Sequence, residues 1–179
     1  MKKFIFISFL LVAVSCIEAQ NKAFKDANGD LVGVVHRSDF KQAPYNNWFN
    51  RNYDSYQLDA VTVSQLKKAF KNIKVKAFMG TWCGDSKRET PHFYKLLDAV
   101  NFDEKNLEMI TVNRSKMTPK NLQLGLNIIR VPTFIFYKKD PKTNKDIEVG
   151  RYVEYARESM EKDILKILNR QNYKHSYDN

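Results

Sequence analysis

The hydrophobic pattern changes period repeatedly between residues 62 and 170. Apolar residues at spacings of three and four predict amphipathic helices, whereas short apolar runs predict buried strands. The predicted helices are 63–70, 84–100, 118–127 and one marked by Met160, Ile164, Ile167 and Leu168. The predicted strands are 75–80, 107–113, 133–139 and 147–153. This order predicts an α/β sandwich whose mixed central sheet is flanked by helices, with an antiparallel hairpin near its end.

The segment before this alternation is polar and aromatic, without a clear period. Residues 20–61 are too few to fold easily alone, so we interpret them as an N-terminal extension lying on a domain at 62–170. The pair Asn28-Gly29 precedes the apolar run LVGVV, which is a hairpin-like turn signal. The aromatic residues of the extension either form a lip for a partner or belong to the core; these include Trp48, Phe49 and Tyr53. Residues 171–179 are a polar tail.

The first residues are typical of a targeting signal. Lys2 and Lys3 precede an apolar run of 11 residues, Phe4–Val14, which is too short to span a bilayer. Two cleavage sites fit. Cleavage after Ala19 would remove a signal peptide of residues 1–19, whereas AVSC resembles a lipobox and would leave a lipidated Cys16 after removal of 1–15. Both predict export to the periplasm or cell envelope, with membrane contact only through the lipid.

The charge and the histidines exclude some functions. The formal net charge is +10, but lysines alternate with acids, as in RESMEKDILKILNR, instead of forming the basic stripe that nucleic-acid binding needs. We therefore expect no nucleic-acid partner. The three histidines, at positions 36, 92 and 175, lack metal-ligand spacing, so we expect neither a metal nor another cofactor.

The chain has two cysteines, and export would leave one thiol. Cys16 is either removed or blocked by lipid, so Cys83 would be the only thiol and no internal disulfide could form. A lone cysteine in an exported protein suggests intermolecular pairing or a reactive thiol, and a buried inert cysteine is the alternative.

The position of Cys83 favours the reactive alternative. It falls between a predicted strand and the start of the helix 84–100, where unpaired N–H groups favour an anion such as a thiolate, by about 0.3–1 kcal/mol at an exposed end. The charge of Asp85 opposes the thiolate, and Lys87 and Arg88 offset part of that effect. Asp85 and Glu89, four residues apart, are more typical of a solvated helix face than of an acid/base pair.

The stretch TWCGDSKRETP resembles the active site of the thioredoxin superfamily. In this resemblance Trp82 precedes the nucleophile Cys83, Ser86 takes the place of the resolving cysteine, and Pro91 is the proline of the active-site helix. VPTFIFY resembles the second landmark of the family and puts Pro132 at the cis-proline position. Gly150 matches the glycine of the last strand. The resemblance covers about two thirds of the mature chain and implies a thioredoxin-like sandwich.

The resemblance also implies roles and two departures. The backbone of Val131 would pair with a substrate chain beside Pro132. Ser86 cannot resolve a mixed disulfide as a thiolate can, but its hydroxyl can donate a hydrogen bond to the Cys83 thiolate. Ala77 stands where thioredoxins keep a buried carboxylate. The loss of both the second cysteine and the buried carboxylate indicates that dithiol chemistry is absent.

Two functions remain open. The first is thiol–disulfide exchange through the single nucleophile Cys83, in which the partners are protein thiols or disulfides, or a low-molecular-weight thiol. The second is a redox-inactive binding module that holds a partner peptide or protein beside the cis-proline loop. The cysteine count excludes a general dithiol reductase acting as a single molecule.

Overall fold

The computed structural model describes residues 23–178, so the predicted signal segment and Cys16 lie outside the described residues. Six strands form one sheet in the order β1-β2-β4-β3-β5-β6, in which only β3 and β4 are parallel. The strands are β1 (Phe24–Lys25), β2 (Leu31–Val35), β3 (Ile73–Met79), β4 (Leu107–Thr111), β5 (Thr133–Lys139) and β6 (Asp146–Val153). The helices are α2 (Arg37–Phe40), α3 (Asn46–Ser55), α4 (Ala60–Ala69), α5 (Gly84–Ala99), the 3₁₀ helix η1 (Glu104–Asn106) and α6 (Met160–Leu168). The α/β fold class is confirmed.

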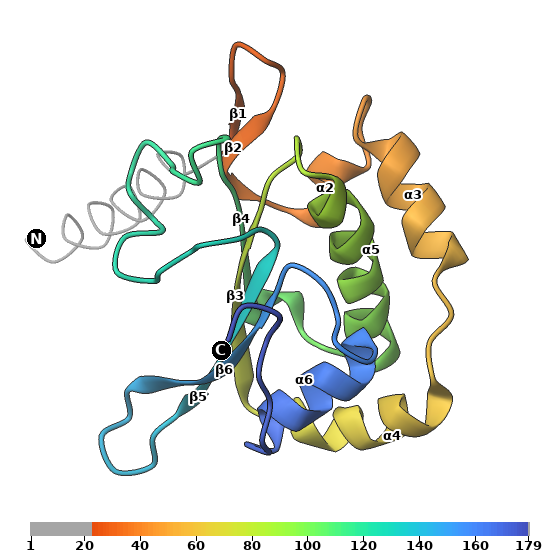
Figure 1. Cartoon of the computed structure of the whole chain (residues 1–179), viewed down its shortest axis with the longest axis vertical. Coiled ribbons are helices and arrows are strands. Elements are labelled where there is room, and N and C mark those ends of the chain that lie inside the picture. The colour runs from red at the N-terminus through yellow and green to blue at the C-terminus, as the bar shows by residue number, and fades with distance from the viewer. Residues whose placement is uncertain (1–22, 179) are drawn as a thin grey trace, which may run out of the picture.

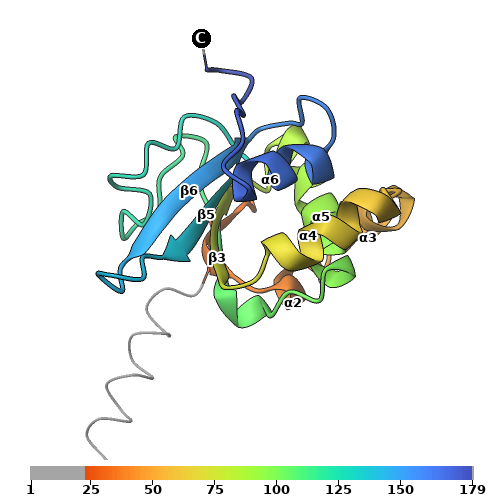
Figure 2. The ribbon, with the colours of Figure 1, turned by 90° about the horizontal axis from the view of Figure 1, so that it is seen from below.

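The two faces of the sheet are covered differently. Helices α3, α4, α5 and α6 lie together on one face, and the second view shows the same arrangement (Figures 1 and 2). The irregular connection from β4 to β5 lies on the other side of the sheet (Figure 1). Each face has its own apolar cluster. The larger one lies under the helices, and the smaller one includes Phe78, Ile110 and Ile135 beneath the irregular connection.

The helix predicted over 118–127 does not form, and this prediction is wrong. That stretch is a series of turns, although Thr118 followed by Pro119 is a helix-start signal. Its backbone adopts left-handed φ angles at Asn121 (54°), Gly125 (76°) and Asn127 (50°), and a right-handed helix cannot continue through such positions. The side chain of Gln123 accepts hydrogen bonds from both the backbone N–H and the hydroxyl of Thr118, which closes a compact turn in place of a helical start.

The N-terminal extension takes part in the sheet and in the core. Strands β1 and β2 form the hairpin that Asn28-Gly29 indicates, with Gly29 at φ 78°, and β2 then pairs with β4. Phe49 of α3 is buried and stacks 5.7 Å from the ring of Phe40, so these aromatic side chains are core rather than an exposed lip. The extension thus helps to build the layer that supports α5.

The last strand and α6 meet at Gly150. A Cβ at this glycine would lie 2.9 Å from the Cγ2 atom of Ile167, which is closer than real Cβ contacts. The register between β5 and β6 shifts between Phe136 and Tyr137, opposite Gly150 and Glu148. A glycine is needed because α6 packs directly on this irregularity of the strand.

Candidate functional site

The site begins where β3 turns into α5. The amide of Cys83 donates to the carbonyl of Gly80 at 3.0 Å, which closes a tight turn, and Cys83 is the N-cap residue of α5. Thr81 fastens the turn to the extension, because its hydroxyl accepts from the amide of Leu31 at 3.0 Å and donates to Asp30 at 3.1 Å. Cys83 is thus held at the N-terminus of a 16-residue helix, as its position in the sequence predicted.

Trp82 closes one side of the turn. Its indole N–H donates to the carbonyl of Val112 at 2.9 Å, and the guanidinium of Arg114 lies 5.7 Å from the ring centroid. The indole packs directly over Gly80, where an added Cβ would lie 2.5 Å from the ring. The position of the tryptophan therefore depends on the absence of a side chain at residue 80.

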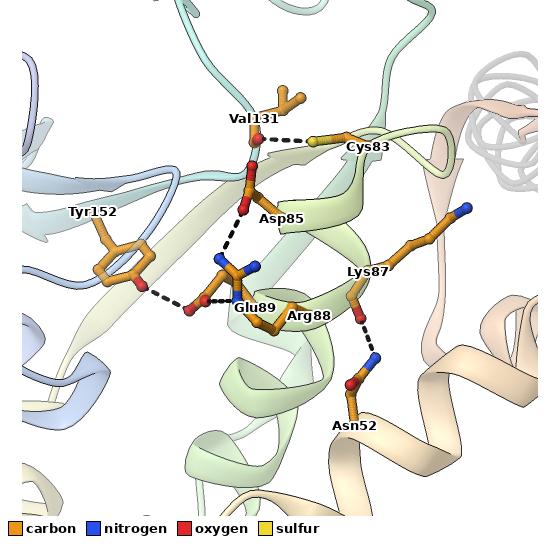
Figure 3. Close-up of polar contacts among 8 residues, drawn as sticks. All are labelled: Asn52, Cys83, Asp85, Lys87, Arg88, Glu89, Val131 and Tyr152. Carbon is orange, nitrogen blue, oxygen red and sulfur yellow. Dashed lines mark hydrogen bonds and ion pairs between the residues drawn. The ribbon is translucent and has the colours of Figure 1, made fainter.

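The thiol of Cys83 faces the loop before β5. Its Sγ atom is 3.3 Å from the carbonyl oxygen of Val131, to which it donates, and the Val131–Pro132 peptide bond is cis (Figure 3). The loop is fixed on both sides. The hydroxyl of Thr133 donates to the carbonyl of Arg130 at 2.7 Å, and the amide of Glu154 donates to the carbonyl of Pro132 at 2.7 Å. Trp82, Cys83, Val131 and Pro132 therefore meet in one place, from segments about 50 residues apart.

A proline inside α5 explains a contact that the sequence did not indicate. Pro91 has no N–H, so the carbonyl of Lys87 four residues earlier lacks its helical partner. The side-chain amide of Asn52 in α3 donates to this carbonyl at 2.9 Å (Figure 3). It also donates to the carbonyl of Trp48 at 2.9 Å. The extension thus supplies a hydrogen-bond donor to the unpaired Lys87 carbonyl in the helix that carries Cys83.

A chain of charged side chains runs along α5 below the thiol. Arg88 donates to Asp85 at 2.7 Å and to Glu89 at 2.8 Å, and the hydroxyl of Tyr152 donates to the other oxygen of Glu89 at 2.7 Å (Figure 3). Glu89 is 6% exposed, so the expectation of a solvated face is wrong for this residue. Burial, together with the charge of Glu89 and its hydrogen bond, raises the pKa of Tyr152.

Other charges complete the surroundings of the thiol. Burial, and then the nearby charge of Asp85, raise the pKa of Glu154, which follows β6 beside the cis-proline loop. Further along α5, burial lowers the pKa of His92 to about 4, with a smaller effect from Arg88, and the ring of Tyr56 stacks on it at 3.9 Å. His92 is therefore a packed histidine that is neutral at pH 7.

Comparison with known proteins identifies the family. A family model described as Thioredoxin matches residues 37–168, which is more than half of the chain. The chain belongs to the thioredoxin superfamily. Neither the curated proteins nor the solved structures give a match to this chain. The match begins inside the segment 20–61 and ends near the close of α6, so it includes α3 together with the site.

Ser86 and Ala77, the two residues that depart from the usual thioredoxin site, are both buried. Ser86 is fully buried, and its hydroxyl accepts a hydrogen bond from the amide of Gly80 at 3.1 Å. Its hydrogen bond to the Cys83 thiolate stays a prediction. Ala77 is fully buried in β3 within the apolar cluster under the helices. Glu89 is a buried carboxylate on the same helix as Cys83, but it is engaged by Arg88 and Tyr152.

Within residues 23–178, no group of three or more His, Cys, Asp or Glu side chains is placed to hold a metal ion, and Cys83 is a free cysteine. No helix in this described part has the length and apolar character to cross a membrane.

Proposed function

We propose that this thioredoxin-like protein is exported and exchanges thiols and disulfides through the single nucleophile Cys83. The observation that carries the proposal is the placement of the thiol at the N-cap of α5, 3.3 Å from the Val131 carbonyl beside Pro132. Protein thiols or disulfides, or a low-molecular-weight thiol, are the proposed partners. A redox-inactive module that holds a partner peptide or protein beside Pro132 is the alternative that the experiments must separate.

The proposed step follows from the chemistry of a single thiol. The Cys83 thiolate attacks one sulfur of a disulfide, a new S–S bond forms, and the other sulfur leaves as a thiolate. Cys83 is thereby oxidised to a mixed disulfide, and the departing sulfur is reduced. Ser86 cannot attack the new bond, so an external thiol must release the protein. On losing its proton, Cys83 would give up donation to Val131 and accept from the N–H groups that open α5.

Introducing a second thiol tests this step. Ser86→Cys should allow an internal disulfide with Cys83, so mixed disulfides should become short-lived and insulin reduction should rise from the low turnover expected of the wild type. Ala77 should keep the gain small. The measurements are the lifetime of the adduct by mass spectrometry and the turnover with dithiothreitol.

The matched control is Ser64→Cys, which adds a thiol on the exposed side of α4. It should leave adduct lifetime unchanged. The exchange proposal fails if wild-type Cys83 forms no adduct with a small neutral disulfide such as 2,2′-dithiodipyridine.

Export predicts a shortened N-terminus. Protein isolated from its native cells should begin at a lipid-modified Cys16 or near Gln20, because Lys2, Lys3 and the run Phe4–Val14 are typical of a signal that is removed. Mass spectrometry of the N-terminal peptide distinguishes the two. An intact Met1 on the native protein would contradict both.

A further inference from the structure

The irregular connection from β4 to β5, residues 113–130, forms a surface beside the thiol. Its half-buried side chains Leu122, Leu126 and Ile128 pack on the apolar cluster that also contacts Trp82 and Cys83. Arg151 of β6 fastens the connection by donating to the carbonyl of Leu126 at 2.7 Å. This segment, which the sequence predicted in part to be a helix, is thus held in a fixed, non-helical form next to the site.

The same segment exposes apolar side chains. Large exposed hydrophobic residues are few in residues 23–178, and three of the seven belong to this connection: Met117 at 48%, Leu124 at 77% and Ile129 at 44%. Leu124 lies between the left-handed positions Asn121 and Gly125, and this local backbone turns its side chain away from the cluster that holds Leu122 and Leu126. Exposed apolar side chains concentrated in one segment are typical of a recognition surface.

The charge of the connection has one sign. The sequence has no acidic residue between Glu108 and Asp140, whereas residues 113–130 contain Arg114, Lys116, Lys120 and Arg130. The Arg114 side chain is 67% exposed and lies over Trp82, and its contact with Asp30 is a long one at 4.0 Å. Arg130 directly precedes Val131, and within the described residues neither Arg130 nor Lys116 makes an ion pair.

Two acids also lie near Cys83. Asp85 lies on α5, and Glu154 follows β6, where its amide contacts the Pro132 carbonyl. Asp85 is already paired with Arg88 at 2.7 Å. Arg88 and Arg130 partly offset the charges of these two acids, so the connection supplies the uniform charge near the thiol, and that charge is positive.

We propose that residues 113–130 are a docking surface for a polypeptide partner that carries acidic and apolar side chains beside its reactive cysteine. Two observations support this occupant: the surface is continuous with the thiol through Trp82 and Val131, and its charge is uniformly positive. The inference rests on the proposed exchange function and adds a class of partner to it. Attraction between opposite charges raises the rate of encounter by about 10- to 1,000-fold in favourable cases, and salt removes the gain.

The experiment uses two synthetic peptides of equal length, each with one cysteine joined to 2-thiopyridine. They share a leucine near the cysteine, and one carries three Asp where the other carries three Lys. The Cys83 thiolate attacks the peptide sulfur, the protein–peptide S–S bond forms, and pyridine-2-thione leaves with the electron pair of the broken bond. Its release gives the rate, and 2,2′-dithiodipyridine gives the intrinsic rate of the thiol without docking.

The acidic peptide should react at least about 10-fold faster than the basic one at ~0.01 M salt, where charges act over about 30 Å. The ratio should fall towards one at ~1 M salt, where the range is about 3 Å. Arg114→Glu with Lys116→Glu should remove or invert the preference. The matched control is Lys142→Glu with Lys145→Glu in the exposed turn after β5, which changes the net charge equally and should keep the preference.

The apolar part has its own control. Leu124→Ser should slow the reaction of the acidic peptide several-fold, whereas Val61→Ser on α4, at a site 68% exposed, should not.

Equal rates for the two peptides, with a normal rate for 2,2′-dithiodipyridine, would overturn the docking surface and leave the exchange function standing. No reaction with any of the three reagents would overturn the exchange function itself. Binding of the whole protein to anionic phospholipid vesicles that is lost in the Arg114→Glu, Lys116→Glu variant, without peptide discrimination, would assign the surface to a membrane instead.

Discussion

Replacing Cys83 with Ala should abolish every mixed disulfide of the mature protein and leave its thermal unfolding nearly unchanged. Cys83 is a free, partly exposed cysteine, and within residues 23–178 its sulfur makes a single hydrogen bond, to the carbonyl of Val131. An alanine keeps the backbone of the N-cap and removes only the sulfur, so the expected cost to folding is small. The measurements are mass spectrometry after exposure to a disulfide, and the midpoint of thermal unfolding.

The same variant separates the two proposed functions. If the protein exchanges thiols, Cys83→Ala should lose the cellular role together with the adducts. A binding module would retain its partner in this variant and lose it when Trp82 is changed, because Trp82 packs on the apolar cluster that includes Val131 of the cis-proline loop. Slow alkylation of Cys83 at neutral pH, combined with an active Ala variant, would refute exchange.

Much of the site could be predicted because its landmarks are local in sequence. Cys83 follows the end of a buried strand and precedes an amphipathic helix. The hydrophobic pattern of each element lies within one continuous stretch of residues. The loop at Pro132 precedes an equally clear strand. The sequence could not give the distance between them, but the fold that the motifs imply brings the Val131 carbonyl to 3.3 Å from the sulfur.

The connection 113–130 could not be predicted because two signals compete within it. Thr118 followed by Pro119 favours the start of a helix, whereas Asn121, Gly125 and Asn127 tolerate left-handed backbone, and the structure follows the second signal. The choice depends on packing against strands of the sheet, which a local pattern does not contain. It matters for function because a helix would have presented different side chains next to Cys83.

Contacts between distant segments were also missed. Asn52 reaches the carbonyl that Pro91 leaves without a partner, 35 residues further along the chain. The proline was a usable signal, since its missing N–H predicts an unpaired carbonyl at Lys87, but nothing in the sequence identifies the donor. The bond between Glu89 and Tyr152 spans 63 residues, so a helical pattern alone made Glu89 look solvated.

The buried hydrogen bond from Tyr152 to Glu89 gives the second prediction with a large expected effect, which concerns stability. Glu89→Ala should lower the free energy of unfolding by about 3 kcal/mol, because it leaves the fully buried hydroxyl of Tyr152 without its charged acceptor. Tyr152→Phe should cost a comparable amount by leaving Glu89 without its donor. Glu89→Ala combined with Tyr152→Phe should cost less than the sum of the single changes, since both polar groups are then removed together. Urea unfolding of the four proteins measures the coupling.

Asp85→Ala is the matched control for that cycle. Asp85 binds the same Arg88 at a similar distance, but its side chain is 35% exposed, whereas that of Glu89 is 8% exposed. Exposed ion pairs contribute about 0–1 kcal/mol, so Asp85→Ala should change stability little. Equal losses for Asp85→Ala and Glu89→Ala would contradict this account, because burial of the carboxylate is the physical difference between the two. A large loss for Glu89→Ala alone, with an unchanged reaction of Cys83 towards 2,2′-dithiodipyridine, would place Glu89 in the support of α5 and outside the chemistry of the thiol.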